Sequence, residues 1–269
     1  MNQMPNPDKM HRAPRPGPEL CVEFFGLPGS GKTTIAREVH AILTRSTPGL
    51  ILAPELLRDE AGVAVRVAAK LRLILSEFAR NGALPDAVRK TFAIRQPRVR
   101  DTLRAVFTVA TVVSLYANVG RRRISAVLDQ GLLQALWSVQ LRLPGNDSDA
   151  LVADLLKEAA HSGRFHVSVE TPSEVCAERL EARASKHSRM QDPGAAGDPH
   201  AWAKAELLHR TILSDFWAAC RRQGSPQRVI VVDGTADPVE VAGQIVAAFL
   251  QFAAAPALPG ATPNQGVTA

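Results

Sequence analysis

The sequence predicts an α/β fold in which a five-stranded parallel sheet lies between two layers of helices. Five short apolar runs are separated along the chain by longer segments that show helical periodicity. The runs are apolar at nearly every position, which is typical of strands buried on both faces of a sheet. A long helical segment, at about residues 59–119, falls between the second and third runs and predicts a helical insert there.

The expected strands are four to six residues long. They span residues 20–25, 50–53, 124–129, 165–170 and 228–233. Outside the insert, helices are expected at residues 33–44, 131–141, 148–161, 172–186, 201–223 and 238–252. Two of them have start signals, because Thr171 precedes Pro172 and Asp237 precedes Pro238, and a capping side chain followed by proline is typical of a first helical turn.

The chain has 269 residues, enough for one sizeable α/β domain, which we expect at residues 19–253. Residues 1–18 carry five prolines and no periodic apolar pattern, so a disordered leader is expected there. Residues 254–269 have the same character and are expected to form a disordered tail.

The formal net charge is +6, and it comes mostly from arginine because the chain has only seven lysines. A phosphate-rich partner or a general bias toward arginine, alanine and proline would each explain this composition. The longest basic run, Arg121–Arg123, has no interleaved aromatic residues. Nucleic acid is therefore not the expected partner.

Three scattered cysteines, Cys21, Cys176 and Cys220, show neither metal-site spacing nor a disulfide framework. They fit a reducing cytosol, and the N-terminal residues lack the apolar stretch of a secretory signal, so a cytoplasmic location is expected. The apolar segment 105–119 is shorter than the ~20 residues that span a bilayer. It is expected to be a core helix, and no membrane partner is expected.

The motif that carries chemistry is GLPGSGKT at residues 26–33, which matches G-x-x-x-x-G-K-[ST]. The composition of the chain gives only about 0.003 chance matches. Glycines let the backbone curl so that its N–H groups point at phosphate oxygens, and the following helix adds its positive N-terminal end. The expected nucleotide-binding residues are Gly26, Leu27, Pro28, Gly29, Ser30, Gly31, Lys32, Thr33 and Thr34. The motif therefore predicts a P-loop NTPase fold.

Within this loop, Lys32 is expected to reach the β- and γ-phosphates of ATP, and the Thr33 hydroxyl to coordinate Mg²⁺. A second metal-side group is an acidic residue at the end of a buried strand. Asp129 is preferred over Glu170 and Asp233, because the third strand is expected beside the first. For each of these acids, a helix N-cap is the alternative role.

Four segments resemble the thymidylate kinase and deoxynucleoside kinase branch of P-loop kinases. They are FFGLPGSGKTT, VLDQGLLQALWSV, FHVSVETPSEVCAERLEARASKHSRM and VIVVDGTADPVEVAGQIVAAF, in order over roughly residues 20–253. The resemblance implies phosphoryl transfer from ATP. It also implies a Pro-initiated helix that ends in R-x-x-x-R, an arginine-bearing lid at about residues 184–200, and a last strand that ends near the base.

Carried over from that branch, Asp129 is the metal-side acid, Arg179 and Arg183 are the helix arginines, and Arg189 is a lid arginine. Arg179 and Arg183 could instead be solvated charges that pair with nearby glutamates. A catalytic set of Lys32, Asp129, Arg183, Arg189 and Glu55 follows.

Glu55 corresponds to the substrate-side carboxylate of some members of that branch, and its alternative is a helix-start carboxylate. Gly234 and Thr235 would approach the adenine. Gln130 stands where the branch has an arginine that contacts substrate, and the insert has no clear counterpart. The resemblance therefore does not identify the phosphoryl acceptor.

Three further side chains have either a functional or a structural interpretation. Gln134 and Trp137 share a predicted helix face with Gln130 and could meet a substrate, or Trp137 could be part of the core. His209, within an apolar-periodic helix, is expected to be a packed histidine.

The sequence thus favours a kinase that uses MgATP and phosphorylates an unidentified small molecule, with a homodimer left open. An NTP-hydrolysing switch that acts with a protein or nucleic acid is the alternative. Such machines often carry glutamate after the metal-side aspartate, where this chain has Gln130, and no N-K-x-D guanine motif is present. A protein that only binds nucleotide is a third alternative.

Overall fold

The computed structural model describes the central part of the chain with several gaps. The described residues are 21–47, 49–53, 57, 62–80, 82–94, 96–141, 143, 152–153, 155–156, 164–183, 189–191, 199–222 and 228–254. The expected leader, most of the lid and of the helix at 148–161, and nearly all of the expected tail lie outside them.

A five-stranded sheet forms the centre of the molecule, and every adjacent pair of its strands is parallel. Its strands are β1 (Cys21–Gly26), β2 (Ile51–Leu52), β3 (Ala126–Leu128), β4 (Phe165–Glu170) and β5 (Val229–Asp233). The spatial order is β2-β3-β1-β4-β5, so the third strand lies beside the first, as expected. The predicted fold class is confirmed.

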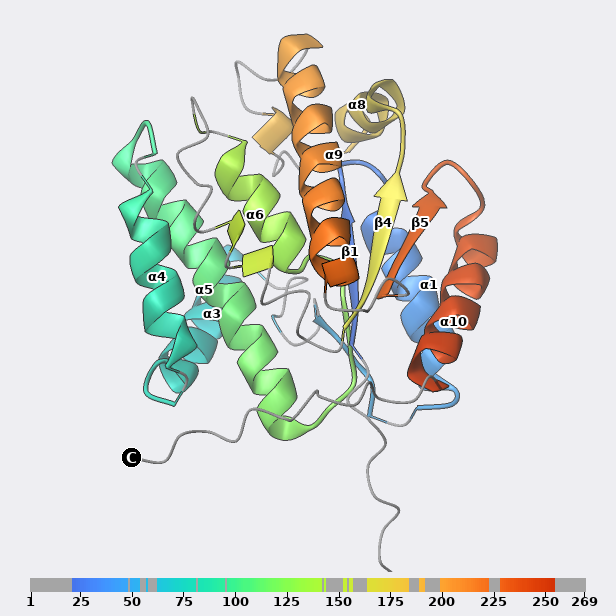
Figure 1. Ribbon diagram of the computed structural model, residues 1–269, viewed down its shortest axis with the longest axis horizontal. Helices are drawn as coiled ribbons and strands as arrows, with labels where there is room; N and C mark the ends of the chain where they lie inside the picture. The colour runs from blue at the N-terminus through green and yellow to red at the C-terminus, as the bar shows by residue number, and fades with distance from the viewer. Residues whose placement is uncertain are drawn as a thin grey trace, which may run out of the picture.

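Helices cover both faces of the sheet (Figure 1). They are α1 (Lys32–Thr44), α3 (Val63–Phe78), α4 (Ala83–Ala93), α5 (Val99–Arg122), α6 (Leu132–Gln140), α8 (Ser173–Glu181), α9 (Pro199–Arg222) and α10 (Pro238–Ala254), with a short 3₁₀ turn η2 at Arg189–Gln191. The first and last helices, α1 and α10, pack together on one face, and α6 and α9 lie on the other. In the residues that the structure describes, the expected helical insert contains α3, α4 and α5.

Alternate side chains of β1 enter two separate apolar cores. Val22 and Phe24 pack with α1 and α10, whereas Phe25 packs with the helices of the opposite face. This burial on both faces explains why β1 reads as a continuous apolar run.

The helix α5 is long and apolar enough to cross a membrane by length and composition alone. However, 56% of its most apolar window is buried inside the fold. Its side chains Val109, Leu115 and Val119 belong to the larger core. The segment expected to be a core helix therefore is one.

Candidate nucleotide-binding site

The phosphate loop connects β1 to α1 and has the backbone that its glycines predict. Gly29 and Gly31 have φ angles of +88° and +93°, in the region that L-residues disfavour. A Cβ atom at Gly29 would clash with the carbonyl oxygen of Cys176, at the start of α8. Glycine at this position is thus required both by the turn and by the close approach of a second element.

Lys32 lies at the first position of α1 and is buried, with 8% of its surface exposed. Its ammonium donates hydrogen bonds to the carbonyl oxygens of Gly26 (2.8 Å) and Leu27 (2.7 Å). Burial lowers the pKa of Lys32 to about 8, and this shift is opposed by the nearby Cys176 and Asp129. A buried cation of this kind is stabilised by anionic oxygens, so the loop fits the phosphates of a nucleotide.

The two side chains expected to hold the metal, Thr33 and Asp129, are in contact. Asp129 directly follows β3, and its carboxylate accepts a hydrogen bond of 3.2 Å from the Thr33 hydroxyl at the start of α1. Hydroxyl and carboxylate oxygens are the ligand types that Mg²⁺ prefers. These two residues, 96 positions apart in the chain, therefore fit a magnesium ion beside the phosphate loop.

Two of the three expected arginines are described. The Arg179 guanidinium donates a hydrogen bond of 2.9 Å to the carbonyl oxygen of Gly234, which joins α8 to the loop after β5. Arg183 is exposed just after α8, and its charge contributes to the lowered pKa of Lys32, so it is within electrostatic reach of the loop. The Arg189 side chain and Glu55 lie outside the described residues.

The loop after β5 packs directly on the phosphate loop. A Cβ atom at Gly234 would clash with the Thr171 hydroxyl and the carbonyl oxygen of Ser30. The backbone N–H and the hydroxyl of Thr235 both donate to Asp233, at 2.7 Å each. Gly234 and Thr235 are thus brought beside the nucleotide-binding loop, where the resemblance expects the base.

Only one of the two expected helix caps is present. Asp237 accepts hydrogen bonds from the backbone N–H groups of Val239 and Glu240, as an N-cap does. The prediction that Thr171 caps α8 is wrong, because α8 begins at Ser173 and Pro172 occupies the cap position. The Thr171 hydroxyl instead donates to the carbonyl oxygen of Ser30 and so braces the phosphate loop.

The proposed shared face of Gln130, Gln134 and Trp137 is also wrong. Gln130 is exposed and precedes α6, which begins at Leu132. Trp137 is buried, and its indole N–H donates to the carbonyl oxygen of Ala205 in α9, which is the core role considered as the alternative. Gln134 is buried and accepts a long hydrogen bond of 3.4 Å from the backbone N–H of Gly26.

Sequence reasoning missed a buried polar network that holds the loop after Asp129. Glu23, fully buried in β1, accepts hydrogen bonds from the Tyr116 hydroxyl and from the backbone N–H of Leu133 (3.0 Å). The Tyr116 oxygen also accepts from the backbone N–H of Leu132 (2.8 Å). Glu23 therefore acts as a remote N-terminal cap for α6. The available signal was a glutamate inside the apolar run LCVEFF.

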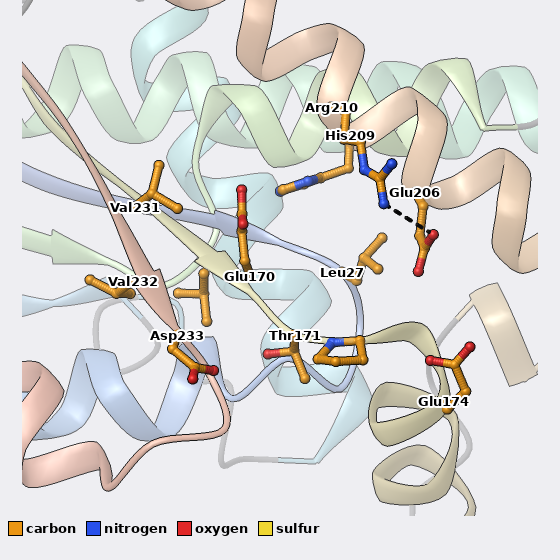
Figure 2. A pocket seen from close by; sticks show the side chains of 12 residues that line it. Leu27, Glu170, Thr171, Glu174, Glu206, His209, Arg210, Val231, Val232 and Asp233 are labelled. Atoms are coloured by element: carbon orange, nitrogen blue, oxygen red, sulfur yellow. Dashed lines mark ion pairs between the residues drawn. The ribbon is translucent and has the colours of Figure 1, made fainter.

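A pocket of about 620 Å³ opens beside the phosphate loop, between the carboxyl ends of β4 and β5 and the helix α9. Figure 2 shows Glu170 and Asp233 on the strand side and Arg210 and His209 on the α9 side. The Arg210 guanidinium lies 3.6 Å from a Glu206 carboxylate oxygen.

His209 is packed, as expected. It is 6% exposed and stacks on Phe25, with 4.4 Å between ring centroids. Burial, together with the positive charges of Lys32 and Arg210, lowers the pKa of His209 to about 4. The imidazole is therefore neutral near pH 7.

Comparison with known proteins assigns the chain to a family. The model of a family described as an AAA domain matches residues 22–199, about two thirds of the chain. This range includes the phosphate loop, Asp129 and the R-x-x-x-R helix. No curated protein matches the chain. The chain therefore belongs to this AAA domain family and is a nucleotide-binding P-loop protein.

Proposed function

We propose that the protein is a kinase that transfers the γ-phosphoryl group of MgATP to a small-molecule acceptor. The observation that carries the proposal is the convergence of three groups on the phosphate loop. These are the buried Lys32 ammonium, the Thr33 hydroxyl and the Asp129 carboxylate. Phosphoryl transfer depends mainly on positioning and charge neutralisation, which these groups supply.

Each residue has a distinct task in this proposal. Thr33 and Asp129 would hold Mg²⁺, which neutralises charge on the phosphates when it is bound. Lys32 exchanges its hydrogen bonds with Gly26 and Leu27 for phosphate oxygens and balances the charge that develops on the transferred group. Arg183 is free to turn toward the same group because its side chain is exposed.

The thymidylate kinase-like assignment is part of the proposal, and two features support it. The Arg179 guanidinium donates to the carbonyl oxygen of Gly234, in the loop that the resemblance expects near the base. The insert of α3, α4 and α5 occupies the position from which that branch builds its acceptor pocket. Gln130 replaces an arginine that contacts substrate in that branch, so the acceptor is left unspecified.

The first experiment measures ADP formation by the purified full-length protein with MgATP, alone and with nucleosides, nucleotides, sugars and aminoglycosides. A kinase gives ADP that depends on one acceptor, and mass spectrometry finds that acceptor phosphorylated. ADP formation without any acceptor would replace the proposal with an ATP-hydrolysing switch. Binding of MgATP without ADP formation would mean that the protein only binds nucleotide.

A matched pair of variants tests the metal-side role. Asp129→Asn removes a carboxylate charge beside the loop and should lower turnover by at least about a hundredfold. Asp215→Asn makes the same change at an exposed position of α9 and should leave turnover unaltered. Equal turnover in both variants would remove Asp129 from the mechanism.

A further inference from the structure

The helix α3 presents an apolar face to solvent. Val63, Val67, Leu71, Leu75 and Phe78 follow one another at intervals of three or four residues, so they lie on one side of the helix. Each is between 42% and 71% exposed. We call these five residues the α3 outer face. It runs the length of a 16-residue helix, about 24 Å.

The opposite side of α3 packs against α5. This contact sets the orientation of the helix and leaves the outer face exposed. Glu77 is buried there, and its carboxylate accepts hydrogen bonds from Asn118 (3.1 Å) and Arg121 (2.6 Å). Leu73 packs against the larger core. Rotation of the helix would break these contacts.

Single exposed apolar residues are ordinary, but a continuous row of large ones marks a surface that another body covers. The charge of the insert that carries this face indicates what that body is. Residues 63–123 contain thirteen arginines and lysines and three acidic residues, a net +10 against +6 for the whole chain. The rest of the chain is thus net −4, and the positive charge is concentrated in the insert.

The charged residues of α3 itself are also mostly basic. Arg72 is exposed beside the outer face, and Arg80 is exposed just after the helix ends. The only acidic residue of α3 is Glu77, which is buried and paired with Arg121. Two copies of the chain that met through this face would bring basic rims together, so an anionic partner is favoured over a second copy.

We propose that the α3 outer face docks on the surface of an anionic lipid bilayer. A convex helix with large apolar side chains on one side and basic residues at its edges suits insertion into the boundary between headgroups and acyl chains. Nearby basic residues add attraction to anionic lipid, about fivefold in affinity for each one close to the surface. This peripheral contact needs no spanning helix, so α5 keeps its place in the core. No membrane partner was predicted because the apolar segment 105–119 is shorter than the ~20 residues that span a bilayer, and peripheral docking does not require a spanning segment.

The test uses the full-length protein and sedimentation with lipid vesicles. Vesicles of phosphatidylglycerol and phosphatidylcholine are compared with vesicles of phosphatidylcholine alone, at low and high salt. The double variant Leu71→Glu/Leu75→Glu places two carboxylates on the α3 outer face. The matched control, Leu207→Glu/Leu250→Glu, makes the same change at exposed positions of α9 and α10. Retained MgATP binding shows that each variant is folded.

The parent protein should sediment with the anionic vesicles and remain in solution with the neutral ones, and high salt should weaken the binding. The α3 variant should bind the anionic vesicles at least about tenfold more weakly, whereas the control should change less than about threefold. Absence of binding by the parent, equal binding to both kinds of vesicle, or equal losses in both variants would overturn the proposal. A parent dimer that the α3 variant alone converts to a monomer, without vesicle binding, would instead make this face a contact between copies.

Discussion

At the scale of single residues, the groups that could be predicted are those that a local motif specifies. The phosphate loop is contiguous in the chain, so Gly29, Gly31, Lys32 and Thr33 were identifiable from spacing alone. The contact of Gln134 with Gly26 was not predictable, because it joins residues 108 positions apart and depends on how α6 packs.

Gly29 provides a direct test of the loop backbone. Gly29→Ala requires an alanine at a φ of +88° and a methyl group against the Cys176 carbonyl, so we expect a loss of at least about 2 kcal/mol and much weaker MgATP binding. Gly243→Ala is the matched control. Gly243 lies within α10 with nothing within 4 Å of its added Cβ, so this change should stabilise by about 1 kcal/mol. Urea unfolding measures both, and a neutral Gly29→Ala would mean that the loop relaxes elsewhere.

His209 makes stability depend on pH with a defined sign. Its pKa is about 4 in the folded protein and about 6.5 when unfolded, so the unfolded state binds more protons between these values. Stability should therefore fall as pH decreases through this window, by about 2 to 3 kcal/mol between pH 7 and pH 4.5. His209→Phe keeps a ring against Phe25 and should lack this part of the loss. Urea unfolding at both pH values tests this, and identical losses in parent and variant would contradict it.

At the scale of elements, the five strands were predictable because each reads as an apolar run. The strands β1, β3 and β4 are buried almost throughout, whereas β5 at the edge of the sheet is only partly buried. Their ends were less predictable, and β2 and β3 are shorter than their runs, because hydrogen bonding to neighbours decides where pairing stops. The helices of the insert could not be separated from sequence. In α3 the apolar residues lie on the exposed side as well as the packed side, so periodicity did not mark the boundary.

The start of α6 was hidden for a similar reason, because its cap comes from Glu23 and Tyr116 on other elements. Burial and the Glu23 carboxylate raise the pKa of Tyr116 well above its usual range, so the phenol stays protonated. Tyr116→Phe would leave buried groups of Glu23 and Leu132 without this partner. We expect a loss of about 1–3 kcal/mol in urea unfolding, together with lower turnover because the loop that carries Asp129 is loosened. Unchanged stability would show that the network does not hold the loop.

At the scale of the whole molecule, the site assembles where the carboxyl ends of parallel strands meet, as is general for open α/β sheets. The strand order places β3 and β4 on either side of β1, and β5 beside β4. The residues at the ends of β1, β3 and β5 therefore lie at the same edge of the sheet. This order follows from the P-loop fold, so Asp129 could be preferred from sequence. The phosphoryl acceptor could not be predicted from the sequence, because its pocket depends on how the insert folds against the sheet.

The measurement that tests the central claim most directly is the affinity for MgATP of the parent and of Lys32→Ala, by calorimetric titration. Lys204→Ala is the control, since the Lys204 ammonium donates a hydrogen bond to the Leu143 carbonyl oxygen and not to the phosphate loop in the described residues. The parent and Lys204→Ala should bind MgATP alike. Lys32→Ala should bind at least about a hundredfold more weakly, a loss of about 2.7 kcal/mol, because a buried cation that meets the phosphates is removed. Equal binding by Lys32→Ala and the parent would contradict the assignment of this loop as the nucleotide site.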